Sequence, residues 1–296
     1  MKFFPFLTMI LLALSCKAQT GTVNMETNKD DNTLLWEVSG KGLSQPSYLF
    51  GTFHLMCRND IHFSENLKAA VLQSKEVYLE LDLDDPSVLL GAMMLMNMNN
   101  GKKLPDLFSQ QEYNRLENFF KDSLHLSLGL FQQMKPVFLE SLLYPKMLPC
   151  KTTSGVEEEL MKLAKQDKKE IQGLETMAFQ ASVFDSIPYD EQARELLKGI
   201  DSLAVYRKYF DTMITVYKTQ QLKAIDEMFS KTEFGMSDNR DILLDNRNKN
   251  WVSQLKKIME KKSVFVAVGA GHLVGEQGLI ALLRKEGYKL RPVVNR

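Results

Sequence analysis

The chain has 296 residues, of which 44% are hydrophobic and 25% are charged, and its formal net charge is +0. This length and composition are those of a soluble globular protein that can bury a substantial core. The lack of net charge argues against a general affinity for nucleic acid or for acidic membranes, so no nucleic-acid partner is expected.

The N-terminus predicts a secretory signal peptide over residues 1–18. Lys2 precedes an apolar run over 3–14, and small and polar residues follow up to Ala18, the predicted cleavage point. The run is too short for a membrane-spanning helix. In a second interpretation the chain is cleaved before Cys16 and lipid is attached to that cysteine. We therefore expect an exported protein, in the periplasm or at the cell surface, whose membrane contact is at most a lipid anchor at Cys16.

Export changes the interpretation of the two remaining cysteines, Cys57 and Cys150. In an oxidising compartment two thiols more often form a disulfide than a metal pair, and a reduced pair of core thiols is the alternative. A Cys57–Cys150 bridge would brace the loop that carries His54. Residues 19–33 are polar and predict a flexible lead-in.

The first predicted elements of the folded region are strands. Residues 34–38 and 47–53 predict an antiparallel hairpin, Ser64 is a predicted N-cap for a helix over 65–74, and residues 77–82 predict a further strand. Strand, helix and strand at this spacing form a βαβ unit. We therefore expect the strands at 47–53 and 77–82 to be parallel neighbours.

The middle of the chain predicts mostly helices. A helix start at 84–86 is followed by a methionine-rich run over 92–98, which is more typical of core filling than of a soft groove. A capping box from Ser154 to Glu157 predicts the start of one helix. The expected elements are single helices over 109–122, 136–148, 154–167 and 238–262, long amphipathic helices within 178–231, and a short strand over 169–174.

The C-terminal part predicts a strand over 263–268, a helix over 277–286 and a closing strand over 288–294. Strands thus cluster at both chain ends, with helices between them. This pattern predicts an α/β fold, close to α+β, in which both chain ends build a central mixed sheet. We expect one discontinuous domain over 34–296, with a large helical insertion at about 85–240.

Two Gly-x-x-His tetrads each follow a short apolar run: Gly51-Thr52-Phe53-His54 and Gly269-Ala270-Gly271-His272. A glycine after a strand allows a sharp turn or a close approach, and ligands gather at the carboxyl ends of strands in open α/β sheets. Imidazole is both the commonest metal ligand and a general base near neutral pH. We expect the two histidines to meet at one site, whereas His62 and His125 lack this context and are interpreted as structural.

Carboxylates follow or end two other predicted strands. Strand periodicity places Glu80 on the face opposite Leu79 and Leu81, which fits a metal ligand or a general base; a solvated edge-strand face is the alternative. Glu175 follows a strand end, although Thr176 also fits a helix N-cap there. Glu157 fits the predicted capping box, although Glu157 and Glu175 could each still point into the cleft.

Arg247 recurs with Leu243, Trp251 and Leu255 at four-residue spacing, which places it on the apolar face of a helix. A buried guanidinium keeps its proton and needs a carboxylate or an anionic ligand. Glu80 and Glu175 are candidate partners, and the guanidinium could stabilise an oxyanion in hydrolysis. A purely structural ion pair is the equal alternative.

Taken in order, these motifs resemble the TraB/GumN group, which includes plasmid pheromone-shutdown proteins and Tiki-type metalloproteases. The resemblance implies a fold like that of erythromycin-esterase and ChaN-like proteins. It also implies a divalent-metal hydrolytic site with His54, Glu80 and His272 at its core and Arg247 and Glu175 in support. The matching pieces are 34–38 (LLWEV), 48–54 (YLFGTFH), 79–82 (LELD), 173–176 (GLET), 247–248 with Trp251, and 268–275 (VGAGHLVG).

The leading hypothesis is an exported metal-dependent hydrolase that acts on a peptide or protein substrate. Its ion would be Zn, Mn, Co or Fe, held by the two histidines and a carboxylate. The alternative is a non-catalytic extracytoplasmic protein that binds a peptide, haem or a metal, with a groove formed by the methionine-rich run and the apolar helices.

Overall fold

The computed structural model describes residues 25–28, 31–82, 84, 95–230 and 239–296. Several expectations lie outside these residues: the signal peptide, the lipid anchor at Cys16, most of the lead-in, and the helix start with the first methionines of the run. Met98 is described and is buried in the helical part of the molecule.

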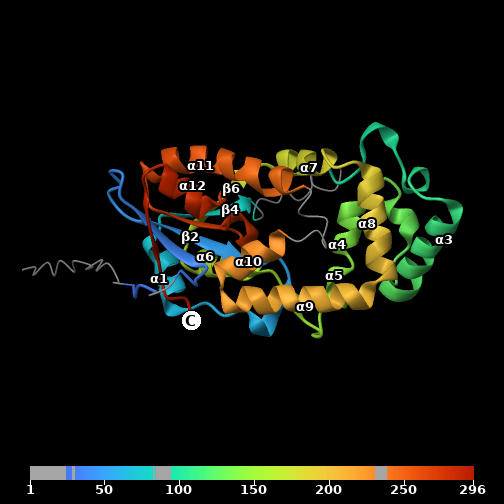
Figure 1. Ribbon diagram of the computed structural model, residues 1–296, viewed down its shortest axis with the longest axis horizontal. Coiled ribbons are helices and arrows are strands. Elements are labelled where there is room, and N and C mark those ends of the chain that lie inside the picture. Colours follow the sequence, from blue (N-terminus) through green and yellow to red (C-terminus); the bar gives the residue numbers. More distant parts are fainter. Residues whose placement is uncertain (1–24, 29–30, 83, 85–94, 231–238) are drawn as a thin grey trace, which may run out of the picture.

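A six-stranded mixed sheet forms the centre of the protein (Figure 1). Only β1 runs against the other strands, because it pairs in antiparallel fashion with both β2 and β8. Both chain ends therefore build the sheet, as the sequence predicts. The strands, in spatial order, are β6 (Glu170–Glu175), β4 (Glu76–Leu81), β7 (Val264–Gly269), β2 (Ser47–Thr52), β1 (Leu35–Ser39) and β8 (Lys289–Pro292).

The prediction that the second and third strands are neighbours is wrong. β2 and β4 are parallel, but β7 lies between them and pairs with both. The crossover through α1 (Glu65–Gln73) leaves a gap one strand wide between β2 and β4, and β7 fills this gap. All five hydrophobic residues of β7 are buried, as expected for a central strand covered on both faces.

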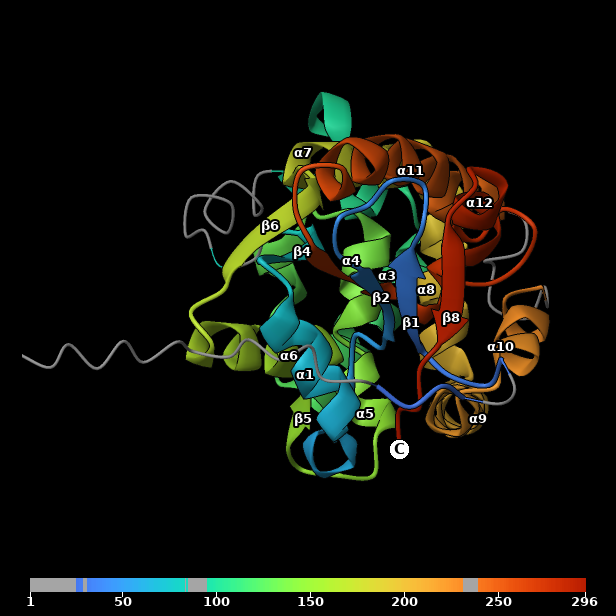
Figure 2. The same cartoon turned by 90° about the vertical axis from the view of Figure 1, so that its left-hand side faces the viewer.

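Helices cover both faces of the sheet. The ribbon views place α1 and α6 (Val156–Gln166) on one side, and α11 (Asn246–Met259) and α12 (Leu279–Lys285) on the other (Figures 1 and 2). Ser64 caps α1 as predicted, since its side chain accepts a hydrogen bond from the Leu67 N–H. A π-helical turn at Asp241–Asp245 leads into α11.

The helical insertion has its own hydrophobic core beside the sheet (Figure 1). The long helix α9 runs from this part of the molecule to the sheet: Phe210 contacts Tyr144 in the insertion and Phe53 at the end of β2. Besides α6, the helices between residues 95 and 230 are α3 (Gln110–Phe119), α4 (Pro136–Ser141), α5 (Tyr144–Met147), α7 (Met177–Asp185), α8 (Tyr189–Asp201), α9 (Leu203–Thr219) and α10 (Leu222–Phe229). Of these, α10 packs against the core around the sheet.

Two local predictions in this region are wrong. The single helix expected over 136–148 is two short helices, α4 and α5, and Pro145, which cannot donate a backbone hydrogen bond, sits in the first turn of the second. The expected capping box at 154–157 does not form. Gly155 is the N-cap of α6, and Ser154 instead belongs to the two-residue strand β5 (Thr153–Ser154).

The strand β5 pairs with β3 (Met56–Cys57) in a small ribbon outside the main sheet. Cys57 and Cys150 form a disulfide beside this ribbon, as expected. The bridge and the ribbon join the segment after His54 to the segment that enters α6. Among the described residues, no helix combines the length and the apolar character needed to cross a membrane.

Candidate functional site

Each of the four adjacent parallel strands β6, β4, β7 and β2 brings one of the expected residues to the same edge of the sheet. Glu175 ends β6, Glu80 is the penultimate residue of β4, and His54 and His272 follow β2 and β7. A Cβ atom placed on Gly269 would lie 3.3 Å from Glu80 Oε1 and 3.5 Å from His54 Nε2. His272 Nε2 lies 3.8 Å from Glu80 Oε1. The two tetrads therefore do converge.

The first glycine of each tetrad has a steric role. A Cβ atom on Gly51 would come within 2.8 Å of Leu273 Cδ1 and 2.9 Å of Leu34 Cδ2, so this glycine lets the segment after the second tetrad pack against β2. The missing side chain of Gly269 leaves open the space between His54 and Glu80. Glycine therefore serves close packing at one tetrad and open space at the other.

The buried guanidinium of Arg247 joins the carboxylates, as its position on the helix predicts. Arg247 Nη2 donates to Glu80 Oε2 at 2.6 Å and to Glu175 Oε2 at 2.9 Å, and Nε donates to Glu175 Oε1 at 2.9 Å. The Arg247 guanidinium also lies over the Trp251 ring, 4.8 Å from its centroid. The cation thus pairs with two carboxylates from two adjacent strands.

The two carboxyl groups respond differently to this setting. Burial alone would raise the pKa of Glu80, but the positive charge of Arg247, together with His54 and the N–H of Gly269, lowers it to about 2. Burial raises the pKa of Glu175, although its hydrogen bonds with Arg247 work against this effect. Glu80 is therefore an ionised acceptor at neutral pH and a poor general base.

His272 is held as a neutral imidazole. Burial lowers its pKa to about 3. Asn248 Nδ2 donates to two backbone carbonyls, so its Oδ1 is the acceptor for His272 Nδ1–H at 2.7 Å. Nε2 carries the lone pair and accepts from Arg247 Nη1 at 3.2 Å. The lone pair thus lies on the side of the ring that is nearest Glu80.

His54 differs from His272 because its side chain is 72% exposed. Its Nδ1 lies 2.7 Å from Glu157 Oε1, which also accepts a 2.5 Å hydrogen bond from Thr52 Oγ1. The Glu157 carboxylate raises the pKa of His54 to about 9. The imidazole is anchored on one side and open to solvent on the other.

Sequence reasoning missed the roles of Thr52 and Asn248. For Glu157 the sequence allows either a capping box with Ser154 or a place in the cleft, and the structure shows its contact with His54 and no capping box. Asn248 directly follows Arg247, so its place in the same helical turn was the available signal. For Thr52 the sequence carries no signal of a role in the site, since threonine is common at strand ends.

The donor set matches a divalent cation in kind. Two imidazole Nε2 atoms and one ionised carboxylate suit zinc or a neighbouring transition metal. Each imidazole also has an acceptor at Nδ1, as metal-binding histidines usually do. Within the described part of the chain, however, no group of three or more His, Cys, Asp or Glu side chains is close enough to hold an ion.

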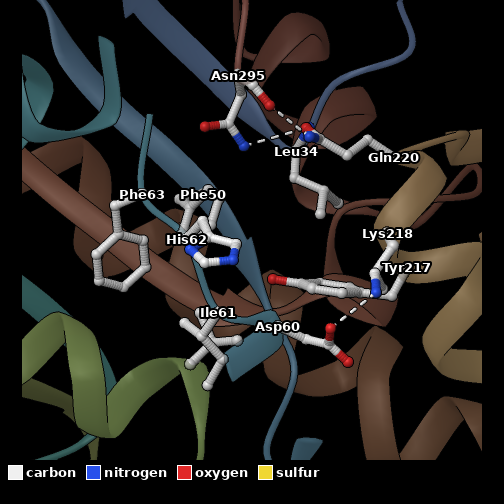
Figure 3. A pocket seen from close by; sticks show the side chains of 11 residues that line it. Leu34, Phe50, Asp60, Ile61, His62, Phe63, Tyr217, Lys218, Gln220 and Asn295 are labelled. Carbon is white, nitrogen blue, oxygen red and sulfur yellow. Dashed lines mark hydrogen bonds and ion pairs between the residues drawn. The ribbon is translucent and has the colours of Figure 1, made fainter. Parts of the chain in front are cut away.

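The cavity shown in Figure 3 is separate from these residues. It has a volume of about 170 Å³, and its lining includes Phe50, His62 and Tyr217 but neither tetrad histidine. Lys218 is paired with Asp60 at 3.0 Å on its rim. His125 is a left-handed helix C-cap, with φ of 57°. Neither of the two remaining histidines belongs to the site.

Fold and site together define an α/β protein with a charged cluster at the carboxyl ends of four parallel strands. The sequence profile of the TraB/PrgY/gumN family matches residues 34–292. The chain belongs to this family, as the motif order predicts.

The chain is also similar to proteins that are named metalloproteases. It is 23% identical to metalloprotease TIKI2 of Danio rerio over 319 residues, which cover 89% of this chain and 61% of that protein. It is 24% identical to metalloprotease TIKI1 of Homo sapiens over 339 residues, covering 94% of this chain and 66% of that protein. The chain thus spans a little under two thirds of these relatives. No solved structure matches significantly.

Proposed function

We propose that this protein is an extracytoplasmic metal-dependent hydrolase that cleaves peptide bonds. The convergence of His54, Glu80 and His272 beside Gly269 carries this proposal. The names of the TIKI relatives support it at the level of a metalloprotease. We also propose a fold like that of the erythromycin-esterase and ChaN-like proteins, since the chain has a split sheet with a helical insertion.

His54, His272 and Glu80 would hold a divalent ion, namely Zn, Mn, Co or Fe. When bound, such an ion polarises a carbonyl and makes water more acidic. Glu80 suits a ligand better than a base because its pKa lies at about 2. A metal at His54 Nε2 would replace a proton there, so binding should weaken at lower pH.

Arg247 and Glu175 would not bind the ion; they would stabilise negative charge in the site. Arg247 keeps the Glu80 carboxylate ionised and places a permanent positive charge at the strand ends, where a substrate oxyanion would develop. Glu175 binds Nε and Nη2 of the same guanidinium and so fixes its plane. In this scheme Glu175 positions Arg247, and Arg247 contacts the substrate.

Export remains part of the proposal. A leader over residues 1–18 would direct the chain out of the cytoplasm, and the Cys57–Cys150 disulfide is consistent with an oxidising destination. Mass spectrometry of the mature N-terminus would separate cleavage after Ala18 from lipid attachment at Cys16. The peptide or protein substrate would then be met in the periplasm or at the cell surface.

One observation favours a second candidate, a non-catalytic protein that binds a peptide, haem or a metal. Arg247 already pairs with Glu80 and donates to His272 Nε2, so these two side chains have a partner without an ion. A tight complex with a peptide, formed without turnover, would favour this candidate.

The first prediction concerns metal content. Purified protein should contain close to one equivalent of a transition metal by elemental analysis, and His54→Ala and His272→Ala should each lose most of it. His62→Ala is the matched control, because this loop histidine lies outside the site. A chelator should abolish cleavage of a peptide library. Equal metal content in all four proteins would contradict the proposal.

A further inference from the structure

The contact between His54 and Glu157 has the form of a support for a metal-binding imidazole. One carboxylate oxygen, Glu157 Oε1, accepts from Thr52 Oγ1 at 2.5 Å and lies 2.7 Å from His54 Nδ1. The Glu157 side chain is 14% exposed, whereas that of His54 is 72% exposed. The solvent-facing ring is therefore attached to a largely buried carboxylate.

The backbone brings the two segments together from far apart in the sequence. Val156 N donates to Phe53 O at 3.0 Å, and β3 pairs with β5 directly beside this contact. A Cβ atom on Gly155 would lie 2.6 Å from His54 O, so only glycine allows so close an approach. The Cys57–Cys150 disulfide closes the same junction. Backbone contacts and a disulfide thus hold the segment of Glu157 against the segment of His54.

The geometry assigns Glu157 as the positioning residue for His54. Glu157 fixes the imidazole through Nδ1 and so directs Nε2 toward the space over Gly269 that Glu80 also faces. Asn248 does the same for His272, whose Nδ1 it holds at 2.7 Å. In both histidines a side-chain acceptor at Nδ1 leaves Nε2 as the nitrogen on the side of Glu80. This assignment rests on the proposed metal site, in which His54 Nε2 is a metal ligand.

A simpler role for Glu157 is to place negative charge in the first turn of α6, next to the helix N-terminus. Glu158 occupies the same turn and provides the comparison. It contacts Ser154 at 3.0 Å and Lys162 at 2.6 Å, and its hydrogen bonds reach no site residue. A role in the helix alone would make the two glutamates equivalent, whereas a positioning role belongs to Glu157.

The test compares Glu157→Ala, Glu157→Gln and Glu158→Gln in the full chain, with Zn²⁺ alone as the titrant in calorimetry. Removing such a support typically costs roughly 10- to 100-fold in metal affinity. We expect a loss of that size for Glu157→Ala and a smaller loss for Glu157→Gln, whose amide oxygen can still accept from Nδ1–H. Glu158→Gln should match the wild type. Equal affinities in Glu157→Ala and the wild type would overturn the assignment.

A second readout needs no metal. The Nδ1–H proton of His54, identified by its loss in His54→Ala, should give a hydrogen-bonded NMR signal in the wild type and in Glu158→Gln, and none in Glu157→Ala. If the wild type binds no Zn²⁺, the proposed function fails. The NMR signal of the His54 Nδ1–H proton then tests by itself whether Glu157 positions His54. Its absence from the wild type would overturn the assignment. Glu157→Gln keeps the test usable if Glu157→Ala does not fold.

Discussion

Arg247 is the residue on which the buried charges depend. It compensates Glu80 and Glu175 together, and removing it would leave two carboxylates without their cation. We predict that Arg247→Met lowers the free energy of unfolding of the metal-free protein by about 3–5 kcal/mol, the usual cost of breaking a buried ion pair on one side. Urea unfolding at neutral pH measures this loss.

The control for that variant is Arg115→Met. Arg115 pairs with Asp201 at 3.2 Å on the surface, where both side chains are exposed. Exposed pairs contribute about 0–1 kcal/mol, so this change should be nearly silent. If both variants lose the same small amount, the Arg247 cluster is not the stabilising feature inferred from its distances.

At the residue scale, the sequence predicts side chains whose local spacing and tertiary role agree. The four-residue spacing around Arg247 places it on the buried face of α11, and the structure confirms this. Glu157 shows the opposite case, since a local capping pattern competes with a contact to His54 across 103 residues of sequence. The pairing of β3 with β5 brings Glu157 to His54 instead of to the capping box. This pairing is hard to predict, because a two-residue strand leaves almost no pattern in the sequence.

At the scale of elements, α4 and α8 pack together around an unusual carboxyl group, Glu140. Burial, together with the nearby charge of Glu195, raises the pKa of Glu140 to about 7 from its ordinary value of 4.5. The folded state therefore holds the Glu140 proton more tightly than the unfolded state. The resulting stability is complete below about pH 4.5 and is lost as the pH rises through about 7.

We predict that Glu140→Gln stabilises the protein at pH 8 and has little effect at pH 4.5. The gain at pH 8 should reach at most about 3 kcal/mol, because folding raises the pKa of Glu140 from 4.5 to about 7. Thermal unfolding at the two pH values measures it. Glu117→Gln, at an exposed position of α3, should show no such pH dependence. A gain of equal size at both pH values would point to packing instead of charge.

The elements themselves are largely predictable, and their arrangement is less so. Apolar runs and caps locate β2, β4, β7 and α1 to within a few residues. The apolar runs do not predict the order of the strands in the sheet, because a βαβ crossover can join neighbouring strands or leave room for another strand between them. The breaks between α4 and α5 and between β5 and α6 depend on Pro145 and Gly155, where short-range patterns allow more than one outcome.

At the scale of the whole molecule, the protein has two hydrophobic cores. One surrounds the sheet, and the other lies among α3, α4 and α8 and the segments between them. Helix α9 spans the distance between them (Figure 1). Separate cores of this kind often open as separate units.

We predict that Leu196→Ala loosens the insertion without loosening the sheet. Leu196 is fully buried in the second core, and such truncations cost about 2–5 kcal/mol. Hydrogen exchange followed by mass spectrometry should then show faster exchange in peptides from α3, α4 and α8, with β7 unchanged. Val266→Ala, in the first core, is the reciprocal control. Equal acceleration in both regions would show a single cooperative unit.

The position of β7 also sets an order of events during synthesis. The sheet has a gap between β2 and β4 until residues 264–269 have left the ribosome, because no earlier segment among the described residues pairs with both strands. A growing chain therefore cannot close its main core, however well the insertion helices form. Contacts this distant in sequence slow folding. For the export that we propose, such a delay would keep the polypeptide unfolded, and so transportable, until β7 has been synthesised.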